Sequence, residues 1–220
     1  MNILITGGLG FIGINLIRKI SKNKKYKLRI LDKINKNQST KILSSARINH
    51  YHLSANLKKK YTTKLQYFSH DLRKSKNLDN ILFDTEIIIH LAASTGVLDS
   101  FKDPMNDFNN NVLGTLNLLE SSRNNNIKKF IFASSSAPLG NVNIPISEIL
   151  PLKPLSPYGS SKASAESYLS SYFHSYGLSS VILRFSNIYG PGSFFKTSVI
   201  AKFIKKIFHK SEIEIFGNGN

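Results

Sequence analysis

The sequence predicts an α/β fold built on a doubly wound parallel sheet of the Rossmann type. Apolar runs rich in Ile, Leu and Phe recur along the chain, and most lack the alternation expected of a strand with one wet face. Stretches with a helical period lie between these runs. A glycine-rich turn joins the first apolar run to the first such stretch, as in the first βα unit of these sheets.

Each element is predicted from its local pattern. The apolar runs predict strands over 2–6, 28–32, 65–68, 86–91, 129–133, 180–185 and 212–216. The helical periods predict helices over 11–20, 105–123, 158–176 and 198–208. Two stretches break this rhythm. Residues 33–64 are polar and lysine-rich, and we expect an insertion with some helix in its second half. Residues 141–157 are rich in proline and predict a surface loop.

Composition narrows the class of protein. With 220 residues and 41% hydrophobic content, we expect one globular domain, or one domain and a fragment. The chain has no cysteine, which excludes disulfides and thiolate metal sites. The six histidines, including His50 and His52, have no acidic neighbours at metal-ligand spacing, so no metal site is predicted.

The formal charge is +17, from 30 Lys and Arg against 13 Asp and Glu. A basic excess often indicates a nucleic-acid or membrane partner. Here it is scattered, without interleaved aromatics, and resembles drift in an AT-rich coding sequence, so neither partner is expected. No apolar run approaches the roughly 18 residues of a membrane span, and no basic leader precedes Ile3. These patterns favour a soluble, cytoplasmic protein.

The glycine turn predicts a dinucleotide site. Gly7, Gly10 and Gly13 stand between the first strand and the first helix, with Phe11 and Ile12 in the same turn. Glycine there lets the backbone approach a pyrophosphate at the helix N-terminus. Asp32 ends the second strand, where a carboxylate accepts hydrogen bonds from ribose hydroxyls and repels a 2′-phosphate, so NAD is favoured over NADP.

A second acid follows the third expected strand. Asp71, with Leu72 next to it, could receive the adenine amino group. An Asp at the end of a strand can equally be a polar cap, and the two readings stay open.

Tyr158 and Lys162 predict a proton-transfer pair. Their spacing of four places both side chains on one helical face, one turn apart. A tyrosine that acts as a base near neutral pH needs its pKa lowered by roughly three units, about 4 kcal/mol. A neighbouring ammonium and a positively charged nicotinamide ring could supply this together. Ser134, Ser135 and Ser136 follow the 129–133 strand at its C-terminal end, where α/β sheets place their ligands. Alone, the first pair could be a solvated helix pair and the serines a polar transition to a loop.

Together, these motifs resemble an extended short-chain dehydrogenase, and more narrowly the nucleotide-sugar epimerase and dehydratase family. The resemblance rests on the glycine turn, Asp32, Asp71-Leu72, His90-Leu91-Ala92-Ala93, Asn111-Val112-Leu113-Gly114-Thr115, the three serines, Tyr158 with Lys162, and the stretch from Leu183 to Pro191. It covers nearly the whole chain apart from 33–64.

The resemblance implies roles for individual residues. Leu91, Ala92 and Ala93 would line the cofactor, and Asn110 would also contact NAD. Ser135 aligns with the catalytic serine or threonine and would meet the substrate. Tyr158 would be the base and a substrate contact, and Lys162 its activator and a ligand of the nicotinamide ribose. Asn187 would contact the substrate diphosphate, and Arg184 would be structural.

The implied reaction is removal of a sugar hydroxyl proton by Tyr158 while hydride passes from the same carbon to the nicotinamide. In an epimerase the resulting keto sugar turns over and the hydride returns to its other face. The family also implies a homodimer formed through the helices over 105–123 and 158–176.

The sequence departs from the family pattern in three places. Dehydratases and decarboxylases carry an acid soon after the catalytic residue, and here Ser136 and Ala137 stand there, which favours epimerisation or keto reduction. Pro138-Leu139-Gly140 replaces the usual Val-Tyr-Gly. The chain also ends early for the family. We therefore expect an NAD-binding domain over 1–190 and a truncated start of the smaller substrate-binding domain over 191–220, either in a fragment of a longer product or in a natural truncation.

The sequence leaves three functions open. The first is an NAD-dependent nucleotide-sugar 4-epimerase acting on a UDP-sugar, with dehydratase, decarboxylase or reductase activity of the same family as the alternative. The second is a truncated NAD-binding module without catalysis. The third, a nucleic-acid binder, rests on charge alone.

Overall fold

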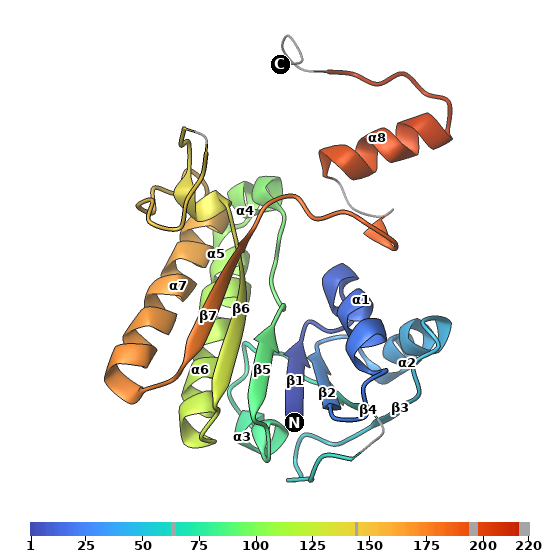
Figure 1. The fold of residues 1–220 in the computed structure, drawn as a ribbon, viewed down its shortest axis with the longest axis vertical. Coiled ribbons are helices and arrows are strands. Elements are labelled where there is room, and N and C mark those ends of the chain that lie inside the picture. Colours follow the sequence, from blue (N-terminus) through green and yellow to red (C-terminus); the bar gives the residue numbers. More distant parts are fainter. Residues whose placement is uncertain (63–64, 144, 194–197, 216–220) are drawn as a thin grey trace. The chain divides into compact units, whose positions relative to one another are not determined.

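The computed structural model describes residues 1–62, 65–143, 145–193 and 198–215 (Figure 1). The chain divides into two compact units, Met1–Phe185 and Ser186–Asn220. The first unit holds the sheet and the helices that cover it. Helix α8 (Val199–Phe208) belongs to the second unit, and its bounds agree within one residue with the helix expected over 198–208.

Seven parallel strands form the sheet, in the order β3-β4-β2-β1-β5-β6-β7. The doubly wound parallel sheet is therefore confirmed. The strand order reverses between β1 and β5, the neighbour of β1 on the other side from β2. This is the switch point at which such sheets bind their ligands. The strands are β1 (Asn2–Thr6), β2 (Lys27–Asp32), β3 (His50–His52), β4 (Leu65–Ser69), β5 (Ile87–His90), β6 (Lys129–Ser135) and β7 (Ser180–Phe185).

Alternate residues of the central strands pack on opposite faces of the sheet. Ile3 and Ile5 lie in one buried cluster with Ile17 and Leu43, from α1 (Phe11–Ile20) and α2 (Lys36–Ser45). Leu4 lies in the other cluster, among residues of α3, α6 and α7. Because both faces of these central strands are buried, their sequences are continuous apolar runs. The covering helices are α3 (Leu78–Leu82), α6 (Gly114–Asn124) and α7 (Pro157–Tyr176), and Figure 1 shows them on the opposite side from α1 and α2.

The segment 33–64 differs from its prediction. Its helix, α2, lies in the first half and not the second, because the Asn35 side chain caps it by accepting from Gln38 N at 3.0 Å, while Leu43 packs into the core. The segment also supplies β3, which pairs in parallel with β4 at the sheet edge. This stretch is therefore part of the sheet and not only an insertion.

The strand expected over 212–216 is also absent, since residues 212–215 form neither helix nor strand, and residue 216 lies outside the described residues.

The helix expected over 105–123 is interrupted by a different kind of turn. It comprises α5 (Pro104–Phe108), a π-helix η1 (Asn109–Leu113) and α6. Such π-turns inside α-helices often occur at functional sites. The short helix α4 (Val97–Lys102) precedes it. The loop expected over 141–157 contains neither helix nor strand in the described residues 141–143 and 145–156.

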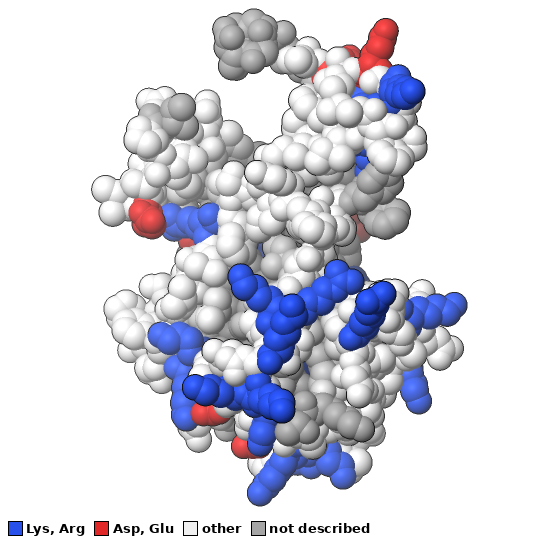
Figure 2. Space-filling view, turned by 45° about the vertical axis from the view of Figure 1, so that its right-hand side comes forward, with Lys and Arg blue, Asp and Glu red and all other residues white. Residues whose placement is uncertain are grey.

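Basic side chains are numerous on the face drawn in Figure 2. Figure 2 shows Lys and Arg at many separate places on the visible face, with few Asp and Glu between them. In the described part of the chain, no helix is long and apolar enough to cross a membrane.

Candidate active site

The predicted site residues of the first unit converge on the carboxyl edge of the sheet. The glycine turn follows β1, Asp32 ends β2, Asp71 follows β4, and Leu91 follows β5. Ser135 ends β6, next to Phe185 of β7. Parallel strands present all their carboxyl ends at one edge, so segments far apart in sequence meet there.

The glycine turn requires glycine for steric reasons. Gly7 has a φ of +65°, and a Cβ there would lie 2.6 Å from the Ala92 backbone. A Cβ on Gly13 would lie 2.5 Å from the Gly8 carbonyl oxygen. A Cβ on Gly10 would meet only the Gly7 carbonyl oxygen, at 3.2 Å. The packing therefore leaves no room for a side chain at Gly7, which faces the loop after β5, or at Gly13, where α1 meets the turn. Gly10 is also the N-cap of α1, so Phe11 and Ile12 begin a helix whose cap carries no side chain.

Asp32 joins the second strand to this turn. Its Oδ2 accepts from Leu9 N at 3.2 Å, and its Oδ1 accepts from Ile34 N at 3.4 Å. Burial raises the pKa of this carboxyl, and the backbone N–H groups that it accepts from oppose that shift. The carboxylate is therefore anchored beside the glycine turn, as a ribose ligand would be.

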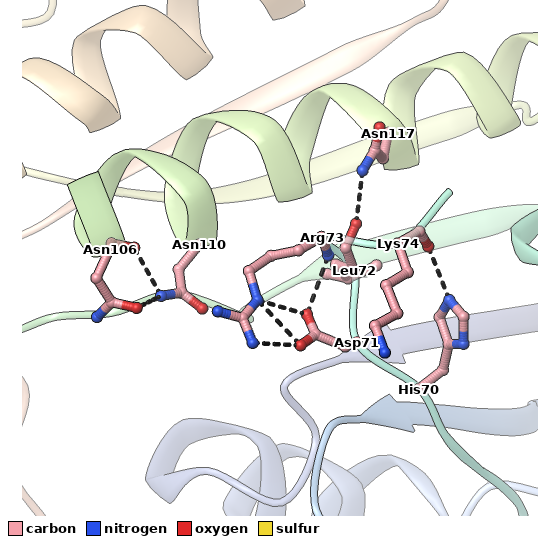
Figure 3. A network of polar contacts seen from close by, with 8 residues as sticks. All are labelled: His70, Asp71, Leu72, Arg73, Lys74, Asn106, Asn110 and Asn117. Carbon is pink, nitrogen blue, oxygen red and sulfur yellow. Dashed lines mark hydrogen bonds and ion pairs between the residues drawn. The ribbon is translucent and has the colours of Figure 1, made fainter. Parts of the chain in front are cut away.

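Figure 3 shows the polar contacts of Asp71, Leu72 and Asn110, each of which has its own hydrogen-bond partner. Both Asp71 oxygens accept from Arg73, with Nη2 to Oδ2 at 2.6 Å. This pairing lowers the pKa of Asp71. Leu72 is buried, and its carbonyl accepts from Asn117 Nδ2 at 2.9 Å. The Asn110 amide donates to the Asn106 carbonyl at 2.7 Å. Asp71 is thus held by Arg73, a partner that the sequence pattern did not single out.

Ser135 and Tyr158 are hydrogen-bonded to each other, and Lys162 lies one helical turn after Tyr158 on α7. Tyr158 is 7% exposed and Lys162 is 3% exposed. Burial raises the pKa of the Tyr158 phenol, and a hydrogen bond with the Ser135 side chain lowers it. Lys162 Nζ donates to the Ala133 carbonyl at 2.8 Å, and it lies 4.6 Å from the centre of the Phe132 ring.

The charge of Lys162 is finely balanced. Burial lowers its pKa to about 8, against the pull of two acids, Asp107 and Glu166. A lysine with such a pKa can change its charge near neutral pH, as proton-transfer sites require.

His90 forms a relay that the motifs alone did not reveal. Thr6 Oγ1 lies 2.6 Å from His90 Nδ1, and His90 Nε2 lies 3.0 Å from Thr115 Oγ1. Thr115 Oγ1 donates to the Asn111 carbonyl at 2.5 Å, so it accepts from Nε2–H, and Nδ1 accepts from Thr6. Burial lowers the pKa of His90 to about 3, so the ring is neutral. The sequence offered one indication of this role: His90 ends an apolar run that is expected to be a buried strand.

Asn111, in the π-helix, ties the neighbouring loops together. Its Oδ1 accepts from Ser94 N at 2.8 Å, beside the loop that carries Leu91, Ala92 and Ala93. Its Nδ2 lies 3.0 Å from Asp107 Oδ1 and 3.1 Å from Ser161 Oγ. Ser161 Oγ in turn donates to the Tyr158 carbonyl at 2.9 Å. Asp107 is a second residue that the sequence patterns missed, although its place one turn before Asn111 could have indicated it.

The loop after Ser135 packs against another segment. Ala137 N donates to Ser135 Oγ at 3.2 Å, and the Pro138 carbonyl accepts from Lys153 N at 2.9 Å. Pro138 and Leu139 are buried in the short 3₁₀ helix η2 (Ala137–Leu139). The departure from the family pattern here is therefore part of a packed turn.

Two residues complete the predicted set. Arg184 forms an ion pair with Glu166 at 2.8 Å, and the Ser134 hydroxyl donates to the same carboxylate. Asn187 is exposed and belongs to the second unit, Ser186–Asn220. Within the described residues, no group of three or more His, Asp or Glu side chains could hold a metal ion.

The model of the NAD dependent epimerase/dehydratase family matches residues 3–220. A putative UDP-glucose 4-epimerase of Methanocaldococcus jannaschii is 38% identical over 99% of this chain and 67% of that protein. A dTDP-D-glucose 4,6-dehydratase of Dictyostelium discoideum is 36% identical over 99% of this chain and 50% of that protein. The crystal structure of UDP-glucuronic acid 4-epimerase from Bacillus cereus, in complex with UDP-glucuronic acid and NAD, is 30% identical with a TM-score of 0.83. It matches 100% of this chain and 67% of its own. The chain thus spans between half and about two thirds of the length of these proteins.

Proposed function

The chain belongs to the NAD-dependent epimerase/dehydratase family, and on that premise we propose that it is an NAD-dependent nucleotide-sugar 4-epimerase acting on a UDP-sugar. The observation that carries this proposal is the hydrogen-bonded pair of Ser135 and Tyr158, with Lys162 one helical turn further on, at the sheet edge that also bears the glycine turn. The relatives include both epimerases and a dehydratase, so the reaction itself is a proposal.

The residues present fit NAD. The backbone at Gly7 and Gly13 is packed too tightly for any side chain, while Gly10 is closed off only by the Gly7 carbonyl, which leaves the α1 N-terminus accessible to a pyrophosphate. Asp32 is anchored beside this turn to accept from the adenosine ribose. When bound, NAD supplies the acceptor and donor of hydride. The remaining proposed cofactor contacts are Phe11, Ile12, Asp71, Leu72, Leu91, Ala92, Ala93, Asn110, Tyr158 and Lys162.

Tyr158 is proposed to take the proton of a sugar hydroxyl. The hydrogen bond between the Ser135 side chain and the Tyr158 phenol fixes the orientation of the phenol group. Burial disfavours the phenolate, so positive charge must offset it, and we assign this part to the Lys162 ammonium, one helical turn after Tyr158 on α7. Ser135 would also contact the reacting oxygen of the substrate. Asn187 would contact the substrate diphosphate.

Epimerisation is favoured over dehydration by the two residues after Ser135. A 4,6-dehydration moves a second proton, for which the family supplies an acid just after this position. Here Ser136 and Ala137 stand there, and Ala137 N donates back to Ser135 Oγ. The proton chemistry of this chain therefore rests on Tyr158.

The domain boundary and the dimer are further parts of the proposal. Residues 1–190 would hold NAD, and 191–220 would begin the substrate-binding part.

Two copies would meet through the α5–α6 and α7 helices. These helices expose apolar side chains at Met105, Phe108, Tyr168, Phe173 and Tyr176, which supports such a contact. Light scattering of Phe173→Glu, with Leu155→Glu as a matched exposed control, should show a monomer only for the first.

The experiment is a titration of NADH fluorescence, followed by incubation with UDP-galactose and with UDP-glucuronate in the presence of NAD. We expect binding, and conversion of one substrate to its 4-epimer by NMR. Tyr158→Phe should bind NADH and lose turnover. Binding without turnover on any UDP-sugar would leave an NAD-binding module in place of the enzyme, and full activity of Tyr158→Phe would remove that residue as the base.

A further inference from the structure

Asp107 is a buried acid that the proposed mechanism does not use. It lies on α5 and is 2% exposed. Its Oδ1 accepts from Asn111 Nδ2 at 3.0 Å, whereas its Oδ2 is buried with no hydrogen-bond partner among the described residues. A buried carboxylate is strongly disfavoured unless a cation nearby compensates its charge. Asp107 therefore requires a cation close by.

Lys162 is the cation on which the charge of Asp107 acts. The Asn111 amide that holds Asp107 also lies 3.1 Å from Ser161 Oγ, on the residue next to Lys162. Helix α5 packs directly on α7, which carries Ser161 and Lys162. Burial lowers the pKa of Lys162 and raises that of Tyr158, and the Asp107 carboxylate raises the pKa of both, so both groups experience its charge.

The other charged groups around Lys162 are already satisfied. Glu166, one turn further along α7, is paired with Arg184 at 2.8 Å and accepts from Ser134. His90, on β5, is neutral because burial lowers its pKa to about 3. Tyr158, on α7, is a neutral phenol whose pKa burial raises further. This leaves Asp107 as the anion near Lys162 whose charge no arginine neutralises in the described residues.

We propose that Asp107 is a positioning residue that serves as the counter-charge of Lys162, keeping the ammonium protonated inside the buried site. The Asn111–Ser161 bridge fixes the carboxylate at the start of α7. Without this charge, burial would strip the proton from Lys162 near neutral pH, and Tyr158 would face a neutral amine. The inference rests on the proposed roles of Tyr158 and Lys162.

The test is an NMR titration that needs neither turnover nor cofactor. The chain is labelled with [6-¹³C]lysine and titrated between about pH 6 and 11, a range that separates a buried lysine from exposed ones near pH ~10.4. The Lys162 signal is identified by its absence in Lys162→Met. It should titrate near 8 in the wild type and at least about one unit lower in Asp107→Asn.

The matched control is Asp103→Asn, which removes the same charge one turn earlier from the exposed N-cap of α5. It should leave the Lys162 titration unchanged. Asp107→Glu keeps the negative charge and should titrate close to the wild type. If Asp107→Asn does not fold, Asp107→Ser removes the charge and keeps an acceptor for Asn111. An unchanged Lys162 titration in a folded uncharged variant would overturn the proposal. Failure of the epimerase assay would leave this titration untouched, so the two proposals fail separately.

Discussion

Thr6 Oγ1 donates to His90 Nδ1 over 2.6 Å, joining the end of β1, where the glycine turn begins, to the end of β5, where the Leu91-Ala92-Ala93 loop begins. Two loops proposed to hold the same cofactor are thus fixed to each other through one neutral imidazole. The second ring nitrogen extends this link to Thr115 on α6. The spacing of these loops is therefore set before any ligand binds.

Replacing His90 with Leu should destabilise the fold. The hydroxyls of Thr6 and Thr115 would lose a partner in the core, at about 1–3 kcal/mol for each buried group left unsatisfied. Urea unfolding would measure the loss. His174→Leu, at an exposed position of α7, is the control and should change little. Equal stability of the two variants would mean that the relay does not stabilise the fold.

His90 should also make the fold sensitive to acid. Its pKa is lowered from 6.5 to about 3, so below pH 6.5 the unfolded chain binds a proton that the folded chain does not. Stability is therefore lost as pH falls from 6.5 toward 3, with a slope of up to about 1.4 kcal/mol per pH unit. Unfolding midpoints across this range should show a shallower slope for His90→Asn, and parallel slopes would contradict the assignment.

Lys162→Met should abolish turnover and remove a rise of stability with pH between about pH 8 and 10.5. Burial lowers the pKa of Lys162 from 10.5 to about 8, so the folded chain holds its proton less tightly than the unfolded chain. Stability therefore rises as pH increases from 8 to 10.5, and below 8 the whole penalty is present. Lys162→Met lacks the group that titrates, so its stability should not rise over this range. Thermal unfolding at pH 7 and 10 checks this: between the two pH values the wild type should gain roughly 1–3 kcal/mol relative to Lys162→Met.

Asp32→Ala should erase the preference for NAD. The carboxylate is expected to repel a 2′-phosphate, so its removal should bring the dissociation constants of NADH and NADPH together. Because Asp32 also accepts from Leu9 N, some loss of affinity for both is expected. Asp32→Asn, which keeps an acceptor for the turn, separates the two effects. Undiminished discrimination in both variants would take Asp32 out of this role.

Arg73→Ala should decide between the two readings of Asp71. Arg73 occupies both carboxylate oxygens. If Asp71 receives the adenine amino group, freeing it should tighten NADH binding several-fold, by about 1 kcal/mol. If Asp71 is only a polar cap, the NADH dissociation constant should not change. Arg123→Ala, which removes a similarly exposed arginine from α6, is the control.

Local pattern alone determined much of this chain. The strands over 2–6 and 180–185 and the helix over 11–20 were predicted to the residue, because an apolar run and a helical period can both be recognised from neighbouring residues. The glycine turn and the Tyr158–Lys162 spacing were likewise visible, since both depend on neighbours within a few residues.

Only the tertiary structure decided the rest. The strand β3 consists of His-Tyr-His, which has no apolar run, and it forms because β4 offers an edge to pair with. Residues 212–215 have the apolar pattern of a strand and do not form one. The chemical character of Lys162 depends on Ala133 and Asp107, which are distant in sequence. Burial and charge at a site come from packing between remote segments, whereas spacing along a helix comes from the covalent chain itself.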